Sequence, residues 1–215
     1  MRDWVQWHTP YDDPESALSA RLRHVRAHLA QAVGQAPAGP VRLVSLCAGQ
    51  GHDVIGVLQD HPRRDDVTAV LVEADPRNAE LARQRAAEAG LTRLDVRQAD
   101  ASRPEHFADA LPAGILLLCG IFGNVSDSDI QRTASAAAGC CAQGGTVIWT
   151  RHRRAPDLTP QVRDWFTAAG FEELAFDAID TGTRAAVGSA RLRTAGPLIL
   201  PAGPLFTFTE GAARR

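Results

Sequence analysis

The sequence predicts a single α/β domain with a doubly wound, mostly parallel sheet. Short apolar segments rich in β-branched residues alternate with segments of helical periodicity, the order expected for parallel strands joined by helices. The first apolar segment ends in a glycine turn, and the next two end in acidic residues. A chain of 215 residues, 45% of them hydrophobic, can bury a substantial core. We expect one domain over 1–215, with an N-terminal arm and helix at 1–40 and the core at 41–215.

The N-terminal region combines an aromatic arm with an amphipathic helix. The aromatic residues of the arm are Trp4, Trp7 and Tyr11, with His8 among them. Asp13-Pro14 is a helix-start signal, and residues 36–40 end the helix. Its apolar stripe consists of Leu18, Leu22, Val25, Leu29 and Val33. The arm either pins this helix to the sheet or forms a lid over a substrate.

The first predicted strand, 41–46, leads into a glycine turn and a helix start. Gly49 and Gly51 are spaced G-x-G, which lets the backbone approach a ligand closely. The following helix N-terminus offers free N–H groups to an anion. Such a turn also occurs where a strand and a helix only need to pack, so its meaning depends on the segments that follow.

Acidic residues follow the next two strands. The strand at 67–72 ends at Glu73, about twenty residues after the glycine turn, where a carboxylate can bind a pair of ribose hydroxyls. Asp75 and Pro76 open the next helix as N-cap and first residue. The strand at 94–99 ends at Asp100-Ala101. A glycine turn and two acids along one sheet edge predict a nucleoside site.

The remaining elements continue the alternation and then break it. We expect a buried central strand at 114–119, a helix at 127–139 opened by acidic residues, a strand at 145–150 and a helix at 159–169. Three further strands, at 171–179, 185–192 and 205–208, follow without helices between them.

This order resembles class I S-adenosylmethionine-dependent methyltransferases over residues 41–195. Gly49 and Gly51 match the first two glycines of their first motif, Cys47 stands where the family has an acid, and Asp53 replaces the third glycine. The resemblance implies a Rossmann-like doubly wound sheet whose last strands form an antiparallel hairpin. It also implies a bacterial small-molecule methyltransferase that transfers a methyl group in line to O or N.

The same resemblance assigns the S-adenosylmethionine site. The turn after the first strand would hold the methionine end, Glu73 the ribose and Asp100 the adenine, while the segment after the fourth strand would border the methyl group. The cofactor-binding residues implied are Cys47, Ala48, Gly49, Gly51, Asp53, Glu73, Ala74, Asp100, Ala101, Cys119, Gly120 and Phe122. Asp53 either serves the ligand or caps its own helix.

Two alternatives stay open. The altered Cys47 and Asp53 are compatible with a non-catalytic protein that uses the same fold to bind a cofactor or partner. An NAD-dependent oxidoreductase is disfavoured because its third fingerprint glycine falls on Val54. Candidate catalytic residues are His8, Tyr11 and His152, because histidine is suited to accept a proton near neutral pH. Residues 151–154 form a basic patch that is either a solvated loop or a contact for an acidic small substrate.

Composition excludes several other functions. All 23 basic residues are arginine, so lysine Schiff bases, pyridoxal phosphate enzymes and lysine-bearing P-loops are excluded. The net charge of −2 gives no general attraction to nucleic acid or membranes. We expect a small-molecule substrate, no metal, no DNA, no membrane, little affinity for RNA, and a homodimer as an allowed state. His24 and His28, at zinc-chelating spacing, are expected to face water.

Cysteine usage and the N-terminal sequence indicate a cytoplasmic protein. The cysteines are Cys47, Cys119, Cys140 and Cys141, which form no C-x-x-C pair. The first residues lack the apolar segment of a signal peptide. We expect reduced, structural thiols.

Overall fold

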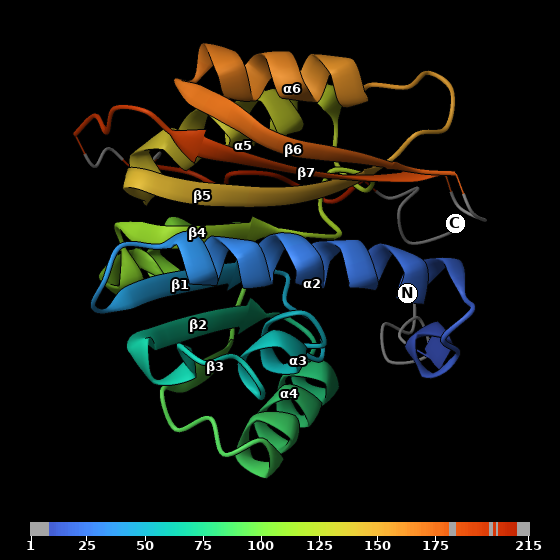
Figure 1. Cartoon of the computed structure of the whole chain (residues 1–215). Coiled ribbons are helices and arrows are strands. Elements are labelled where there is room, and N and C mark those ends of the chain that lie inside the picture. Colours follow the sequence, from blue (N-terminus) through green and yellow to red (C-terminus); the bar gives the residue numbers. More distant parts are fainter. Residues whose placement is uncertain (1–8, 181–183, 198–199, 201, 210–215) are drawn as a thin grey trace.

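The computed structural model describes residues 9–180, 184–197, 200 and 202–209. Seven strands form one sheet in the order β3-β2-β1-β4-β5-β7-β6 (Figure 1). Their bounds are β1 (Val41–Leu46), β2 (Val67–Glu73), β3 (Leu94–Gln98), β4 (Ala113–Leu118), β5 (Cys141–His152), β6 (Phe171–Ile179) and β7 (Ala185–Leu192). Strands β1 to β5 pair in parallel, whereas β7 is antiparallel to both β5 and β6. The predicted fold class is confirmed.

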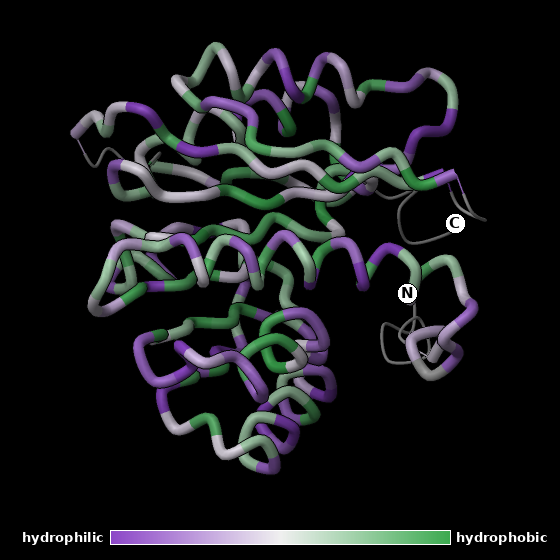
Figure 2. Tube along the Cα trace, viewed as in Figure 1, coloured by the Kyte–Doolittle hydropathy of each residue, from purple (hydrophilic) through white to green (hydrophobic). Residues whose placement is uncertain are grey.

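Helices cover both faces of the sheet. The bounds are α2 (Ala17–Gln35), α3 (Val54–Leu58), α4 (Pro76–Glu88), α5 (Asp127–Cys140) and α6 (Thr159–Ala168), with short 3-10 turns η1 (Thr9–Asp12), η2 (Arg64–Asp66), η3 (Pro104–His106) and η4 (Ala108–Ala110). Buried residues of α2, α3 and α4 share one hydrophobic core with the sheet, and those of α5 and α6 share the other. Hydrophobic residues accordingly concentrate along the strands (Figure 2). None of the helices in the described part of the chain has the length and apolarity needed to span a bilayer.

Local capping explains where the helices begin. Asp75 accepts hydrogen bonds from the backbone N–H groups of Arg77 and Asn78, as its N-cap position predicts. The expected start of α2 at Asp13-Pro14 is wrong, because Ser16 is the N-cap and accepts from the Ser19 backbone. Asp13 instead closes a small turn by accepting from Glu15 N. An Asp-Pro pair favours both arrangements, so the local signal alone could not choose between them.

The predicted strand at 205–208 is not formed as a strand. Phe208 makes one isolated antiparallel bridge with Val125, and Leu205 N donates to Ser102 O at 2.8 Å. Thr207 N donates to a carboxylate oxygen of Asp129 at 2.9 Å. The segment is apolar because Leu205 and Phe206 fill the core, not because it extends the sheet.

The prediction that His24 and His28 face water is wrong for His28, whereas the His24 side chain is 43% exposed. Both histidines of α2 contact Asp177 of β6: His24 Nδ1 lies 2.7 Å and His28 Nε2 3.0 Å from Asp177 Oδ2. The His28 side chain is only 6% exposed. Because the apolar stripe is narrower than the surface that α2 presents to β5, β6 and β7, these polar residues also face the sheet. Asp177 therefore fastens α2 to the antiparallel hairpin.

Replacing Asp177 tests this fastening. Burial alone would raise the pKa of Asp177, but the hydrogen bonds from His24 and His28 outweigh burial and hold that pKa below 3.8. A carboxyl group whose pKa is lower in the folded protein than in the unfolded chain stabilises the fold at pH values above its unfolded pKa. This stabilisation is lost as the pH falls through the pKa of the folded state. We expect Asp177→Asn to lower Tm at neutral pH by roughly 2–4 °C. The difference in Tm between wild type and Asp177→Asn should vanish in acid. The control variant Asp65→Asn on η2 should have nearly the Tm of wild type at each pH. Equal Tm values for wild type and Asp177→Asn across the pH range would contradict the role of Asp177.

Candidate nucleoside site

The loops that follow β1, β2, β3 and β4 meet at the carboxyl edge of the sheet. The register pairs Leu46 with Val72 and Glu73 with Gln98, so the glycine turn, Glu73 and the Asp100 segment leave neighbouring strands together. The order in which successive strands are added to the sheet reverses between β1 and β4, and ligands of open α/β sheets bind at such a switch point. The arrangement brings together the cofactor residues that the sequence predicted after these strands.

The turn after β1 is shaped by left-handed backbone conformations. Cys47, Gly49 and Gly51 have φ angles of 55°, 56° and 70°. Gly51 N donates to Ala48 O at 3.0 Å, and Ala48 N donates to Val72 O at 3.1 Å, which ties the turn to β2. A Cβ on Gly51 would lie 2.6 Å from Ile55 Cδ1. Glycine is therefore required here by the packing of α3 as well as by the backbone.

The Glu73 carboxylate is held by two backbone amides. Gly49 N donates to Oε2 at 2.8 Å and Asp75 N donates to Oε1 at 2.9 Å. Burial raises the pKa of Glu73, and these amides lower it in part. A carboxylate has about four acceptor positions, so about two remain for further donors. Ala74 lies between Glu73 and Asp75 in the chain. The site thus presents a fixed acceptor pair suited to a vicinal diol.

Asp53 is the N-cap of α3. Its Oδ1 accepts from Val54 N at 2.8 Å, and burial raises its pKa. Of the two roles left open by the sequence, helix capping is the one formed in the structure. The side chain is only 8% exposed.

Asp100 closes the turn after β3 and keeps an accessible carboxylate. Its Oδ1 accepts from Ser102 N at 2.9 Å, while Oδ2 lies 3.7 Å from Arg103 Nε and the side chain is 56% exposed. Ala101 beside it is buried and fixes the turn in the core. Because Leu205 N bonds Ser102 O, the C-terminal segment also supports this turn. The predicted adenine acid is therefore oriented but available.

Hydrogen bonds from β5 and within the segment itself hold the segment after β4. Gly120 N donates to Thr150 Oγ1 at 2.8 Å, and Asn124 Nδ2 donates to Gly120 O at 2.8 Å. Gly120 has φ 78°, and a Cβ on it would face open space. Phe122 is fully buried, so it packs in the core and does not line an open surface. Its carbonyl accepts from the Arg151 guanidinium.

Comparisons with known proteins identify the family. Residues 17–164, most of the chain, match a family model described as "Putative methyltransferase". The chain belongs to this methyltransferase family. A search of curated proteins finds no match.

Solved methyltransferase structures share the fold at low sequence identity. An O-methyltransferase family protein from Burkholderia thailandensis superposes with TM-score 0.64 at 16% identity, over 84% of this chain and 57% of that one. This chain thus spans little more than half of that protein. Magnesium protoporphyrin IX methyltransferase from Synechocystis PCC 6803 superposes with TM-score 0.67 at 12% identity, over 87% of this chain and 90% of that one. An RNA methyltransferase from Salinibacter ruber superposes with TM-score 0.51 at 18% identity, over 82% of this chain and 95% of that one.

Tyr11 is the described part of the aromatic arm, since Trp4, Trp7 and His8 lie outside the described residues. Its ring centroid lies 4.6 Å from that of His52 in the glycine loop, and Arg21 Nη2 lies 3.1 Å from its hydroxyl. Burial raises the pKa of Tyr11, with Asp53 and Cys119 adding to the rise against the opposing effect of Arg21. Tyr11 is therefore a neutral phenol beside the glycine loop at neutral pH, not a ready base.

His152 lies beside the segment after β4. A Cβ on Gly123 would lie 3.2 Å from its Cδ2. The interpretation of 151–154 as a solvated loop is wrong in its first half, because Arg151 and His152 end β5 and Arg151 is only 8% exposed. Arg153 pairs with Asp157 and Asp180. Arg151 and Arg153 of the basic patch thus make contacts within the protein.

The thiols are free and suited to structural roles. Cys47 packs against the core shared with α5 and α6, whereas Cys119 packs against the core of the opposite face. Burial raises the pKa of both thiols, and it raises that of Cys140 to about 12. At neutral pH they are protonated and poor nucleophiles. Among the described residues no group of three or more metal-ligating side chains could hold a metal ion.

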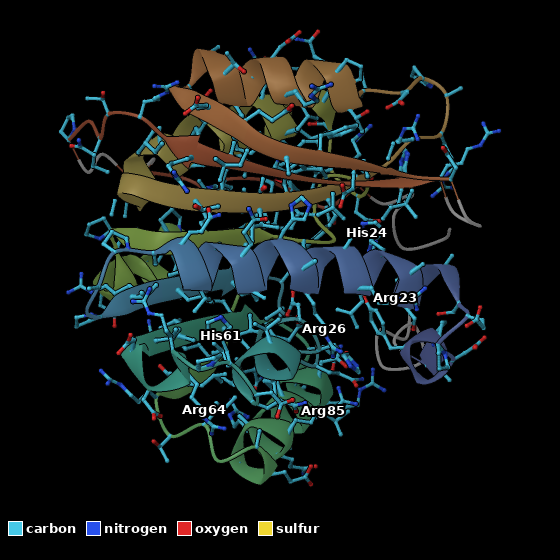
Figure 3. All side chains as sticks on the ribbon, viewed as in Figure 1. Arg23, His24, Arg26, His61, Arg64 and Arg85 are labelled. Carbon is cyan, nitrogen blue, oxygen red and sulfur yellow. The ribbon has the colours of Figure 1, made fainter. Side chains whose placement is uncertain are left out.

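The sequence alone did not indicate several residues that support the site. Gln50 Nε2 donates to Asn78 Oδ1 at 3.1 Å, a buried link from the glycine loop to α4. Arg26 of α2 donates twice to His52 O, and Arg85 of α4 donates to Gln50 O (Figure 3). In the sequence, Arg26 and Arg85 are only long polar residues on amphipathic helices. Such residues also occur on helix faces that contact solvent, so the pattern does not single them out.

Replacing Gly51 tests the shape of the loop. Gly51→Ala would require φ 70° and would place a methyl group against Ile55, so we expect a loss of about 1–2 kcal/mol in the free energy of unfolding. The matched control is Gly34→Ala in α2, where the added methyl group meets nothing within 4 Å. The higher helix propensity of alanine should raise the free energy of unfolding of this control by about 0.5–1 kcal/mol. Denaturant unfolding measures both; equal stability of Gly51→Ala and wild type would refute the packing account.

Proposed function

We propose that this protein is an S-adenosylmethionine-dependent methyltransferase that acts on a small molecule. The observation that carries the proposal is the Glu73 carboxylate, partly buried and fixed by two amides between a glycine turn and a helix start. Membership of a methyltransferase family supports the same reaction. A dinucleotide oxidoreductase shares the ribose acid but lacks this family support.

The chain's own groups fit the cofactor at three places. Glu73 keeps acceptor capacity for ribose hydroxyls, and Asp100 keeps an exposed carboxylate for an amino group. Open space at the Cβ position of Gly120 leaves room beside the segment after β4. Residues Cys47, Ala48, Gly49 and Gly51 would surround the methionine end. S-adenosylmethionine supplies an activated methyl group on a sulfonium leaving group.

The protein's contribution is alignment and exclusion of water. Positioning two reactants in line can supply on the order of 7–11 kcal/mol, so no strong acid–base pair is needed when the acceptor arrives deprotonated. Where a proton must leave an O or N acceptor, His152 is the candidate base, and Tyr11 orients the acceptor as a neutral hydrogen-bonding group. A net charge of −2 favours a small molecule over a nucleic acid.

Calorimetric titration with S-adenosylmethionine and with NAD tests the cofactor, and methyl transfer over a metabolite panel tests activity. We expect S-adenosylmethionine alone to bind. Cofactor binding without transfer to any acceptor would instead favour the non-catalytic alternative raised by Cys47.

Glu73 variants test the ribose assignment. Glu73→Ala removes charged acceptors worth about 1.5–3 kcal/mol, a loss of roughly 10- to 150-fold in affinity for S-adenosylmethionine. Glu73→Gln keeps one oxygen and should lose less. Glu80→Ala, an exposed acid on α4, is the control and should bind like wild type. Undiminished affinity of folded Glu73→Ala would reject the assignment.

Tyr11→Phe tests the arm. The variant keeps the ring against His52 but removes the hydroxyl near Arg21, so cofactor affinity should hold while kcat/KM falls about tenfold, the cost of one hydrogen bond of about 1.4 kcal/mol. Removal of residues 1–12 should abolish transfer and preserve cofactor binding. If the truncated protein is folded and fully active, the arm is not a lid, and His152 is the one candidate catalytic residue that remains.

A further inference from the structure

A groove of about 550 Å³ lies at the amino edge of the sheet, opposite the nucleoside site. Its lining comes from the end of α2, the 36–40 linker, the first residues of β1, β4 and β5, and Arg191 of β7. The end of α2 and the first residues of these strands lie at the left in Figure 1. The predicted cofactor residues lie at or after the carboxyl ends of β1, β2, β3 and β4, on the opposite edge of the sheet. A ligand in the groove would therefore not compete with the nucleoside.

An irregularity in strand pairing builds one wall of the groove. Ala113 pairs with Cys141 but Ile115 pairs with Thr146, so Gly114 alone lies opposite residues 142–145. A Cβ on Gly145 would lie 2.8 Å from Ala142 O and 2.9 Å from Ala113 O, so the bulge closes only around glycine. Gly144 adopts φ 74°, and a Cβ on it would meet nothing within 4 Å. The fold thus maintains an opening where regular pairing would close the edge.

Two arginines in the groove lack carboxylate partners. Arg42 Nη1 donates to Leu111 O at 3.1 Å, and Arg191 Nη2 donates to Gln35 Oε1 at 3.2 Å. Neither forms an ion pair within the described residues, and no acidic residue lines the groove. Some arginines outside the groove pair with acids, as Arg97 does with Asp109, whereas others such as Arg64 donate to backbone carbonyls. Each guanidinium has five N–H donors, so both retain capacity for an anion.

The geometry points to a second ligand site: we propose that the amino-edge groove binds an organic anion with an apolar body. Alanine and proline side chains supply apolar walls, and Arg42 and Arg191 would hold carboxylate or phosphate oxygens. The volume is within the range of small-molecule pockets, about 300–1,000 Å³. The site is independent of the proposed methyl transfer.

Calorimetry with 1-anilinonaphthalene-8-sulfonate, which joins fused rings to one anionic group, tests the site on the full chain. We expect one dye per chain and an affinity about tenfold weaker in the double variant Arg42→Gln/Arg191→Gln. The control Arg83→Gln/Arg163→Gln makes the same change in net charge at exposed arginines outside the groove and should bind like wild type. Circular dichroism and Tm check that each variant is folded.

Three further measurements separate the alternatives. N-phenyl-1-naphthylamine, the ring system without the sulfonate, should bind at least tenfold more weakly; equal binding would overturn anion recognition. Saturating S-adenosylhomocysteine should leave the dye in place, and displacement would assign the dye to the cofactor cleft and overturn the proposal. Failure of S-adenosylhomocysteine to bind would instead bear on the proposed function alone.

The probes 1-naphthoate and 1-naphthyl phosphate distinguish carboxylate from phosphate ligands. Both should depend on Arg42 and Arg191, and the tighter of the two identifies the preferred anion. Affinities that are equal in wild type and the double variant would show that the arginines hold no anion. Ala38→Trp, which fills the groove without changing charge, should weaken all of these probes, and undiminished binding would place them elsewhere.

Discussion

The hydrogen bonds to the Glu73 carboxylate are the constraint on which the site depends. They join the glycine turn after β1 to the beginning of α4 through Glu73, which is 24 residues from Gly49 in sequence. Because the carboxylate is largely buried, leaving either amide without its acceptor would be costly. The acceptor is thus oriented by the fold itself, before any ligand arrives, which is the preorganisation that tight nucleoside binding requires.

The glycine loop serves both sides of the proposed site. Arg26 and Arg85 hold its carbonyls from outside, and the Gln50–Asn78 bond holds it from within. His52 of the same loop carries the ring against which Tyr11 lies. A substitution in the loop is therefore expected to affect the cofactor and the arm together.

The two edges of the sheet are built differently. At the carboxyl edge, strand ends are joined by short, well-bonded turns, and the segment 202–209 reinforces them through Ser102, Asn124 and Asp129. At the amino edge, the slip between β4 and β5 leaves the backbone open beside unneutralised arginines. Functional groups on one sheet can thus be supplied at both ends without sharing space.

The sequence by itself determined the alternating fold, the glycine turn, the acids at Glu73 and Asp100, and the Asp75 cap. These features rest on periodicity and on residues that act within a few positions of their own backbone. Only the tertiary structure decided that His24 and His28 meet Asp177, that residues 205–208 support turns and form no strand, and that Arg42 and Arg191 share a groove. These outcomes depend on contacts between segments far apart in the chain, which the local pattern of a single sequence does not specify.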